Sequence, residues 1–449
     1  MRVVVIGLAA TGMAVTRVLR TEGWDVTILE DAPGGSGAYG GRVIDAHDLG
    51  AQILETPSAA SIRIAVAGAD LVVPSPLVPL SHPALDAARV SGIPIRSEID
   101  LAGARAQAPI VAISGTNGKT TVTTLAAAML NESGRRAVAA GNVGRPLIDA
   151  VRDDVDVLVA EVSSFQLACS QTFHPHVAVV LAISPDHLDW HGSYERYVSD
   201  KARISAHQTA EDLLVFDADD ADASTIAQTA VARVVGFSRH ADAIGRAREV
   251  DGQLRAADDT VMASVAGMRR SLVHDRTNAL AAGTAALAVG ATPAGIRTAL
   301  GSYVTLPHRV ALVGEANGVR WYDDSKATNP DATLRALESF DSVVLLAGGR
   351  NKGLDLGVLA RAGARVRGVV AFGEAATDIA AAFGDTSTVV TVGSMHDAVR
   401  AAARLARAGD AVLLSPACAS FDAYANYAER GNDFAAEVRG LLVEGASSP

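Results

Sequence analysis

Short runs of valine, isoleucine and leucine alternate with longer segments of helical periodicity through most of the 449 residues. Continuous apolar runs of this length are typical of strands buried on both faces of a parallel sheet, with helices covering those faces. A chain of this length also exceeds one ordinary hydrophobic core. We therefore predict several α/β domains. The expected strands are VVVIG (3–7), DVTILED (25–31), ADLVVPSP (69–76), IPIRSEID (93–100), VDVLVAEVSS (155–164), VAVVLAIS (177–184), VVLLAGG (343–349), VRGVVAFG (366–373) and AVLLSP (411–416).

Changes in composition and periodicity indicate where the domains meet. An Ala/Gly-rich segment, LAGARAQAP (101–109), precedes a new strand, and a third section begins near LPHR (306–309). Between about 210 and 273 the helical periodicity gives way to short strands with turn signals, and a helix is expected near 276–289. The predicted domains are residues 1–102, 103–304 and 305–449.

The overall charge restricts the partners of the chain. A formal net charge of −11, from 39 basic and 50 acidic residues, disfavours nucleic acid and anionic membrane surfaces. The apolar run MRVVVIGLAATG is too short for a signal peptide or a membrane span. Cys169 and Cys418 have no CxxC or metal-site spacing and are expected to be reduced thiols. We expect a monomeric cytoplasmic protein that binds neither nucleic acid nor membrane.

The first strand runs into a glycine turn that resembles a dinucleotide fingerprint. Its pattern is Gly7-x-Ala9-x-x-Gly12, and Glu30 and Asp31 end the second strand, where a ribose-binding carboxylate belongs. Alanine at the middle position weakens the dinucleotide interpretation, because glycine there lets a pyrophosphate approach the backbone. Another nucleotide diphosphate at the helix N-terminus, or a turn without any ligand, stays open.

The stretch AISGTNGKTTVTTLAAAML (112–130) reads as a buried strand, a glycine-rich turn and a helix. It is shorter than a Walker A loop, whose first glycine would stand at Ile113. The turn nevertheless offers backbone N–H groups and a helix dipole to an anion. Lys119 can neutralise phosphate charge, and the Thr120 hydroxyl can reach Mg²⁺. A nucleotide triphosphate is therefore the expected ligand of this turn.

Three further residues are candidates for the same site. Glu161 ends an apolar strand, where a phosphate loop needs a carboxylate on Mg²⁺; a plain surface strand end is the alternative. His187 lies in an acid-rich loop, where it contacts metal or phosphate or is simply hydrogen-bonded. Lys201 lies in a helical stretch, and without further information a solvated helix face is the favoured interpretation.

Taken together, the motifs resemble the Mur ligases, which are ATP-dependent amide ligases of peptidoglycan precursor synthesis. The resemblance covers essentially the whole chain in order, which makes it specific although each motif alone is not. In this family the phosphate loop is itself GTNGK[ST], so Ile113 is not a lost glycine. The matching stretches are GTNGKTT (115–121), GNVG (141–144), EVSSFQL (161–167), SPDHLDWHGS (184–193), SDKARI (199–204), LPHRV (306–310), DDSKATNP (323–330), GGRNKG (348–353) and SPACASFD (415–422).

The resemblance implies a fold and a reaction. The fold is a Rossmann-like N-terminal domain that binds a UDP substrate, a central P-loop-ATPase-like domain with a parallel sheet, and a Rossmann-like C-terminal domain that binds an amino acid. SKATNP and SPACASFD are similar to the member that adds D-glutamate to UDP-N-acetylmuramoyl-L-alanine through an acyl phosphate, giving ADP and phosphate. ATP and two Mg²⁺ ions are the implied cofactors.

The resemblance also implies roles for individual residues. Lys119, Glu161, His187 and Lys201 form the catalytic group, and Lys201 matches a lysine that is carbamylated in the family. Thr120, Glu161, His187 and carbamylated Lys201 would hold metal. ATP would bind Gly115, Thr116, Asn117, Gly118, Lys119, Thr120, Thr121, Asn278, Arg309, Asp324 and Lys326. The UDP substrate would bind Thr11, Asp31, Asn142 and His187, and D-glutamate would bind Thr328, Lys352, Ser420 and Tyr427.

Three positions depart from the family pattern. The HNxxN motif reads His274-Asp275-Arg276-Thr277-Asn278, which puts the contact of the first asparagine in doubt. Leu77 stands where a glycine often follows Ser-Pro, so the diphosphate contact there is also in doubt. Tyr427 occupies a position where phenylalanine also occurs.

Other functions stay open at this point. A related ligase could add L-alanine, a diamino acid or folate glutamates. An NAD(P)-dependent oxidoreductase could be built on the first glycine turn, and a nucleotide switch on the phosphate loop. The switch leaves DDSKATNP and SPACASFD unexplained.

Overall fold

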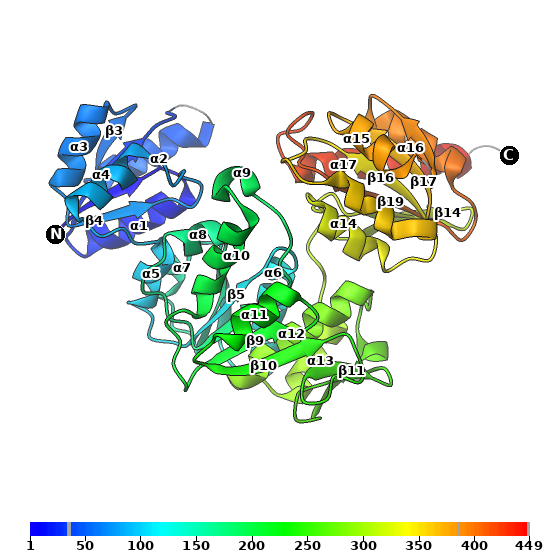
Figure 1. Ribbon diagram of the computed structural model, residues 1–449, viewed down its shortest axis with the longest axis horizontal. Helices are drawn as coiled ribbons and strands as arrows, with labels where there is room; N and C mark the ends of the chain where they lie inside the picture. Colours follow the sequence, from blue (N-terminus) through cyan, green and yellow to red (C-terminus); the bar gives the residue numbers. More distant parts are fainter. Residues whose placement is uncertain (34–36, 385, 447–449) are drawn as a thin grey trace. The chain divides into compact units, whose positions relative to one another are not determined.

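The computed structural model describes residues 1–33, 37–384 and 386–446, and this described part divides into two compact units (Figure 1). The first unit comprises Met1–Ile183, Glu195–Arg269 and Thr277–Tyr303. The second comprises Ser184–Tyr194, Arg270–Arg276 and the chain from Val304 onward. No helix in the described ranges is long and apolar enough to cross a membrane.

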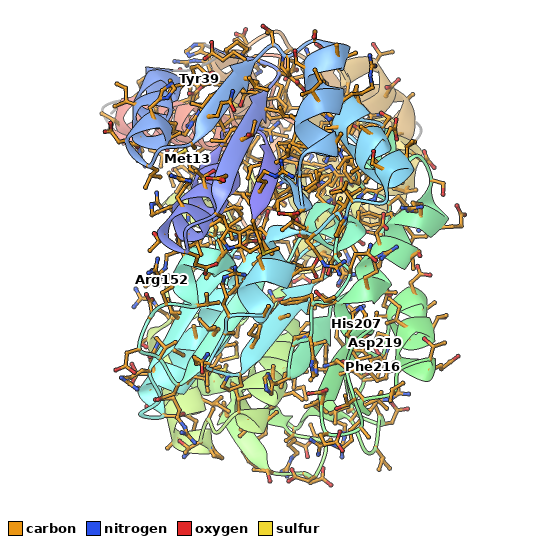
Figure 2. The ribbon with its side chains drawn as sticks, turned by 90° about the vertical axis from the view of Figure 1, so that its left-hand side faces the viewer. Met13, Tyr39, Arg152, His207, Phe216 and Asp219 are labelled. Carbon is orange, nitrogen blue, oxygen red and sulfur yellow. The ribbon has the colours of Figure 1, made fainter. Side chains whose placement is uncertain are left out.

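A parallel sheet with helical connections opens the first unit. Its elements are β1 (Arg2–Ile6), α1 (Ala10–Thr21), β2 (Asp25–Glu30), α2 (Gly37–Asp48), β3 (Gln52–Glu55), α3 (Ala59–Ala67), β4 (Leu71–Pro74) and α4 (Pro83–Ser91). The strand order is β3-β2-β1-β4, and every pairing is parallel. Val4 and Ile6 of β1 pack in one cluster with Ile62 of α3 and Leu85 of α4. Figure 2 marks Met13 on α1 and Tyr39 on α2 beside this sheet.

The segment 93–100 is not the strand that we predict from its sequence. Only Ile95 pairs with the sheet, through an isolated bridge to Val72. Helix α5 (Glu98–Gly103) begins at once, because Ser97 and Asp100 form a capping box. The Ser-x-x-Asp spacing is the helix-start signal that the apolar reading overlooks.

Two buried carboxylates of α5 tie this helix to the part of the first unit that follows. Glu98 accepts hydrogen bonds from the backbone N–H of Ile148 (2.7 Å) and from Nε2 of Gln166 (3.3 Å). Asp100 accepts from Oγ of Ser170 at 2.8 Å and from backbone N–H groups beside it. Desolvation raises the pKa of Glu98 to about 7, although these hydrogen bonds oppose the shift.

A second sheet fills the rest of the first unit. Its strands are β5 (Ile110–Ser114), β6 (Ala137–Gly141), β7 (Val157–Glu161), β8 (Val177–Val180), β9 (Leu213–Asp217), β10 (Arg233–Ser238), β11 (Ala247–Val250), β12 (Gln253–Arg255) and β13 (Val261–Ser264). The order is β13-β12-β11-β10-β9-β8-β5-β7-β6, parallel from β6 to β11 and antiparallel from β11 to β13. Figure 2 marks Phe216 on β9 and Asp219 just after it.

Helices surround this second sheet. They are α6 (Lys119–Glu132), α7 (Leu147–Ala150), α8 (Ser164–Ala168), α10 (Tyr194–Ala202), η1 (Arg203–Ser205), α11 (Ala221–Gln228), η2 (Val265–Gly267), α12 (Val273–Ala288) and α13 (Pro293–Ser302). One core joins Val111 and Ile113 of β5 to Val122 of α6, Leu280 of α12 and Ile296 of α13. The helix that we predict near 276–289 is therefore confirmed as α12.

The second unit contains a sheet covered on both faces. Its elements are α9 (Leu188–His191), β14 (Ala311–Ala316), β15 (Val319–Asp323), α14 (Pro330–Leu337), β16 (Val343–Gly348), η3 (Leu356–Arg365), β17 (Val366–Phe372), α15 (Ala376–Phe383), β18 (Thr388–Thr391), α16 (Met395–Leu405), β19 (Ala411–Ala417) and α17 (Tyr427–Ala446). The order is β14-β15-β19-β16-β17-β18, with only the β14–β15 pairing antiparallel among the described strands. Leu345 packs toward α14 and α15, whereas its neighbour Leu346 packs toward α16 and α17.

The α/β class with parallel sheets is confirmed. The sheets of the described residues lie within 2–74, 110–264 and 311–417, each inside one of the predicted ranges. The ranges 1–102, 103–304 and 305–449 remain our proposed domain boundaries.

Candidate active site

The loop between β5 and α6 needs glycine at two positions. Gly115 has a φ of 145°, and a Cβ there would lie 2.5 Å from Cβ of Leu181. Gly118 has a φ of 86°, and its Cβ would lie 2.7 Å from Oδ1 of Asn278. Gly118 also precedes α6 without a side chain to cap it, so the start of the helix can receive an anion. Asn278 thus adjoins the loop, while Thr116, Asn117, Lys119, Thr120 and Thr121 belong to the loop or the first turn of α6.

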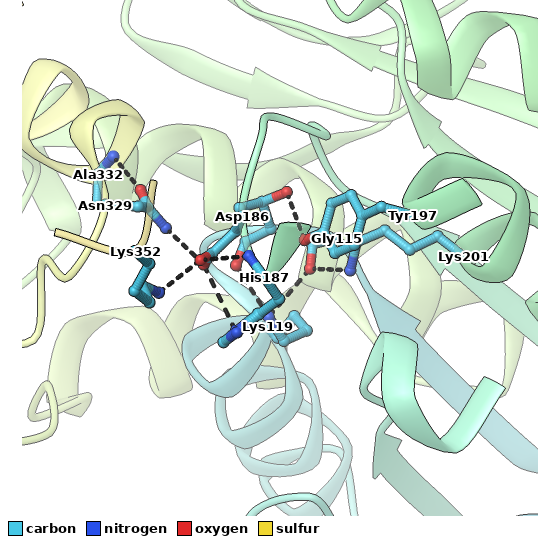
Figure 3. Close-up of polar contacts among 10 residues, drawn as sticks. Gly115, Lys119, Asp186, His187, Tyr197, Lys201, Asn329, Ala332 and Lys352 are labelled. Carbon is cyan, nitrogen blue, oxygen red and sulfur yellow. Dashed lines mark hydrogen bonds and ion pairs between the residues drawn. The ribbon is translucent and has the colours of Figure 1, made fainter. Parts of the chain in front are cut away.

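Two lysines converge on this loop. Nζ of Lys119 donates to the carbonyls of Gly115 (3.0 Å) and Thr116 (2.9 Å). Nζ of Lys201, on α10, donates to the same Gly115 carbonyl at 2.7 Å (Figure 3). Lys201 is 1% exposed, so the solvated helix face that composition favoured is wrong. Lys201 therefore lies beside the phosphate loop, and its role there stays a prediction of the resemblance.

Tyr197 is a member of this cluster that the sequence analysis did not single out. It lies one helical turn before Lys201, and its hydroxyl is 3.0 Å from Oγ1 of Thr116 (Figure 3). The ammonium of Lys201 lies 4.6 Å from the centre of the Tyr197 ring. The i, i+4 spacing in YVSDK was the available signal, because both side chains then share one helix face.

Glu161 is positioned beside the loop by the sheet itself. It ends β7, in register with Ile113 of β5, and is 3% exposed. Its Oε1 accepts from Nδ2 of Asn142 at 2.8 Å, whereas its Oε2 is buried without a hydrogen-bond partner in the described structure. A buried carboxylate oxygen is costly to leave unpaired, so a cation fits this position. No group of three or more histidine, cysteine, aspartate or glutamate residues is preassembled for metal binding within the described ranges.

In the first sheet, the glycine turn that follows β1 is held by Glu30, the last residue of β2. A Cβ at Gly12 would lie 2.0 Å from the carbonyl oxygen of Gly7, so only glycine fits. The carboxylate of Glu30 accepts from the backbone N–H groups of Leu8 (2.7 Å) and Ala32 (3.0 Å). Because it is committed to the turn, Glu30 does not offer a ribose-binding carboxylate, which weighs against an NAD(P) site.

Thr11 and Asp31 lie near this turn. Thr11 is in the first turn of α1, and Asp31 directly follows β2. Oδ2 of Asp31 is 2.9 Å from Nε2 of His82, a buried residue that the sequence analysis did not identify. Leu77, at the position that departs from the family pattern, is 72% exposed.

Within the second unit, Asp186 lies at the centre of a polar cluster. Its carboxylate accepts from Nζ of Lys352 at 2.5 Å and from Nδ2 of Asn329 at 3.0 Å (Figure 3). The backbone N–H of His187 donates to Oδ1 of Asp186 at 2.9 Å. Burial raises the pKa of Asp186, but the charge of Lys352 and the hydrogen bonds outweigh it and hold the pKa below its ordinary value. The sequence analysis identified the acid-rich loop, but it did not single out Asp186 within it.

Loops that follow two adjacent parallel strands carry further predicted site residues. Lys326, assigned to ATP, and Thr328, assigned to the amino acid, follow β15; Ser420, also assigned to the amino acid, follows β19, its neighbour in the sheet. The ammonium of Lys326 lies 4.1 Å from the centre of the Tyr427 ring. Ser325 secures the arrangement by donating from Oγ to the Tyr427 carbonyl at 2.8 Å.

Asp324 is a buried residue that contacts the segment carrying Arg309. Oγ of Ser415 donates to its Oδ2 at 2.9 Å, and the N–H of Val310 points to its Oδ1 at 3.3 Å. Desolvation raises the pKa of Asp324 to about 7, although the Ser415 hydrogen bond and the charge of Arg309 oppose the shift. Arg309 and Asp324 thus lie close enough for their charges to interact.

The lysine content of the chain gives independent support to these assignments. Only four of the 39 basic residues are lysines, and all four are candidate site residues: Lys119, Lys201, Lys326 and Lys352. Arginine serves equally well in most solvated positions, but it cannot replace a compact ammonium or a carbamylated amine. The restriction of lysine to these four candidate positions was readable in the sequence.

Comparison with known families and relatives shows that the chain belongs to the Mur ligase family. The family model described as Mur ligase middle domain matches residues 113–286, and the one described as Mur ligase, glutamate ligase domain matches residues 308–418. A UDP-N-acetylmuramoylalanine–D-glutamate ligase from Desulfosudis oleivorans is 42% identical over 98% of this chain and 96% of its own length. Its counterpart from Myxococcus xanthus is 38% identical over 98% of both chains.

Solved structures share the fold at lower identity. UDP-N-acetylmuramate-alanine ligase MurC from Thermotoga maritima matches with a TM-score of 0.58 and 19% identity, covering 98% of this chain and 99% of its own. MurF ligase from the same organism, in complex with ADP, matches with a TM-score of 0.58 and 18% identity, covering 93% and 95%.

Proposed function

We propose that this chain, which belongs to the Mur ligase family, joins D-glutamate to UDP-N-acetylmuramoyl-L-alanine with conversion of ATP to ADP and phosphate. The similarity of nearly the whole chain to relatives named for D-glutamate addition carries the proposal. We place the reaction in the cytoplasm, where ATP and nucleotide-linked precursors are available, and take the enzyme as a monomer.

The reaction needs an activated carboxyl group. A carboxylate does not condense with an amine at neutral pH, because its oxygen is a poor leaving group. Transfer of the γ-phosphate of ATP to the carboxylate of the L-alanine moiety gives an acyl phosphate. The amine of D-glutamate then attacks the acyl carbon, loses a proton, and expels inorganic phosphate. Both steps concentrate negative charge, so catalysis requires fixed positive groups and N–H donors.

The phosphate loop supplies these groups. Lys119 hydrogen-bonds to its own loop carbonyls, and we propose that its ammonium turns to the β- and γ-phosphates when ATP is present. The backbone of Gly115–Thr121 holds the phosphates, and Asn278 contacts the adenine. Arg309, Asp324 and Lys326 complete the ATP site. The orphaned Oε2 of Glu161 supports Mg²⁺ binding by Glu161, Thr120, His187 and carbamylated Lys201, and the ions would neutralise phosphate charge.

Carbamylation of Lys201 is part of this proposal. A buried amine is more readily uncharged than a solvated one, and the uncharged amine is the form that reacts with CO₂. Lys201 is almost fully buried and already faces the phosphate loop. A carbamate there would place a negative oxygen beside the loop, where a cation is needed.

The two organic substrates bind at the remaining clusters. Thr11 and Asp31 contact the uridine, and Asn142 and His187 contact the muramoyl part. Thr328, Lys352, Ser420 and Tyr427 hold D-glutamate, and Asp186 supports this group by keeping Lys352 in place. A lysine suits an acidic amino acid because it offers a charge-assisted hydrogen bond to a carboxylate.

Phosphate release from ATP tests the function directly. We expect release only when both UDP-N-acetylmuramoyl-L-alanine and D-glutamate are present. L-Glutamate, L-alanine and a diamino acid serve as matched substitutes, and tetrahydrofolate replaces the nucleotide substrate in a further control. Equal or greater release with one of these would assign the chain to another reaction of the family.

A further inference from the structure

Asp275, which replaces the first asparagine of the HNxxN pattern, is fully engaged by the protein. Nε and Nη2 of Arg270 donate to Oδ2 and Oδ1 of Asp275, both at 2.7 Å. The backbone N–H of Leu272 also donates to Oδ2, at 3.1 Å. Asp275 is 7% exposed and the Arg270 side chain 24%, so the carboxylate is buried and the guanidinium partly buried. Both oxygens of the Asp275 carboxylate are therefore already hydrogen-bonded within the protein.

The third nitrogen of the same guanidinium holds a different segment. Nη1 of Arg270 donates to the carbonyls of Arg309 (2.7 Å) and Val310 (3.0 Å). Arg270 thus connects the start of α12 to the stretch LPHRV, whose arginine is a candidate ATP contact. All of these residues belong to the second unit.

The backbone that Arg270 holds is strained. His308 has a φ of 62° and Val310 a φ of 48°, a left-handed region that side chains, and β-branched ones above all, rarely adopt. Such conformations persist only where the surroundings enforce them. Here Arg270 binds the carbonyl side of Val310, and Asp324 accepts from its N–H. Arg309 lies between His308 and Val310, so the same contacts hold the backbone that carries its side chain.

We propose that Arg270, oriented by Asp275, is a positioning residue that directs Arg309 toward the phosphates of ATP. The inference rests on the proposed function, because it takes ATP as the ligand of Arg309. Asp275 then supports nucleotide use indirectly, at the position where the HNxxN pattern has its first asparagine. Aspartate and arginine act as a pair: asparagine at 275 would leave the partly buried guanidinium without its counter-charge.

Coupling between Arg270 and Arg309 tests the proposal. The variants are R270M, D275N, R309A and the double variant R270M/R309A, assayed for phosphate release with ATP varied and the other substrates saturating. We expect R270M to lower kcat/KM for ATP about tenfold or more, with KM for D-glutamate unchanged. D275N should act in the same direction. In the R309A background, R270M should cause no further loss, because its effect passes through Arg309.

Thermal unfolding of the same variants separates positioning from stability. R270M is expected to lower Tm equally with and without Arg309, while its kinetic effect depends on Arg309. Additive kinetic losses, or a lower Tm with unchanged kcat/KM for ATP, would overturn the proposal. Binding of a non-hydrolysable ATP analogue to wild type and R270M gives a readout that needs no ligation. Wild-type protein that binds the analogue but adds no D-glutamate would refute the proposed function, while the R270M comparison would still decide this inference.

Discussion

Nδ2 of Asn142 donates to Oε1 of Glu161 over 2.8 Å and fixes the carboxylate so that the buried Oε2 remains unpaired within the described structure. Residues that orient a metal ligand typically contribute about 10–100-fold to metal affinity. We therefore expect N142A to raise the Mg²⁺ concentration for half-maximal phosphate release by about that factor. The measurement is a Mg²⁺ titration with ATP and both co-substrates saturating.

A matched control exists for this variant. Asn131, on α6, also makes side-chain hydrogen bonds, but on the surface, to Ala137, the first residue of β6. N131A should leave the Mg²⁺ titration unchanged. If N142A also left it unchanged, Glu161 would not hold the metal through this oxygen.

Lys119 is expected to be indispensable for ATP turnover. Its ammonium is the only lysine charge that the first turn of α6 contributes, and phosphoryl transfer requires neutralisation of the γ-phosphate. K119A should reduce phosphate release by at least about 10²-fold, the usual scale for loss of one electrostatic contact in a transition state. Near-normal ligase activity in K119A would contradict the assignment of residues 115–121 as the phosphate-binding loop.

Lys201 should behave differently from Lys119, because the proposed active species is a carbamate rather than an ammonium. K201A leaves a cavity beside the Gly115 carbonyl where the side chain now reaches. We expect an inactive variant whose phosphate release is partly restored by formate or acetate, small carboxylates that fit such a space. K119A is the control and should show no rescue. Full activity of K201A without added acid would exclude a carbamate requirement.

Glu98 should make the stability of the first unit depend on pH. Its pKa rises from 4.5 to about 7 on folding, because the buried carboxyl is favoured in its protonated form. Its contribution is therefore complete below pH 4.5 and is lost as the pH rises to 7. A shift of this size corresponds to about 3 kcal/mol. Relative to E98Q, the wild-type protein should lose about that much unfolding free energy between pH 4.5 and 7.5.

Chemical unfolding at several pH values measures this difference. E132Q, at an exposed position near the end of α6, should run parallel to wild type at every pH. A constant offset between E98Q and wild type across the range would show that Glu98 does not titrate in this window.

Most of the structure that could be predicted from the sequence came from patterns within a single strand, helix or loop. Continuous apolar runs identified the buried strands, and the glycines of the phosphate loop stand where positive φ and close packing require them. The strand expected at 93–100 failed because the capping signal at Ser97 competed with the apolar residues before it. In this segment the apolar residues favour a strand and the capping residues favour a helix. The hydrogen bonds of the capping box decide between them, and the chain forms a helix.

Contacts between residues far apart in the chain could not be predicted from such local sequence patterns. His82 precedes an ordinary helix start, and no spacing relates it to Asp31, 51 positions earlier. Arg270 looks like one basic residue among many until its hydrogen bonds to Arg309 and Val310 are seen. Asp186 and Lys352 meet only because the chain folds back over 166 positions. Such partners depend on tertiary geometry, so no periodicity reveals them.

His82 leads to a prediction about the UDP substrate. Its Nδ1 accepts from the backbone N–H of Ala84 at 3.1 Å, so the proton of the neutral ring lies on Nε2 and is donated to Asp31. Asp31 is 57% exposed, and this hydrogen bond is what orients its carboxylate. Loss of a hydrogen bond to a charged group costs about 1.5–3 kcal/mol. H82F should therefore raise KM for UDP-N-acetylmuramoyl-L-alanine by about tenfold or more, with kcat and KM for ATP unchanged.

Replacement by glutamine sharpens this test. The amide of H82Q can still donate toward Asp31, so its KM should lie between those of wild type and H82F. In a D31A background, H82F should add nothing further, because its effect acts through that carboxylate. A fall in kcat, or an equal rise in KM for ATP, would instead mean that His82 supports the fold of the first sheet and not the orientation of Asp31.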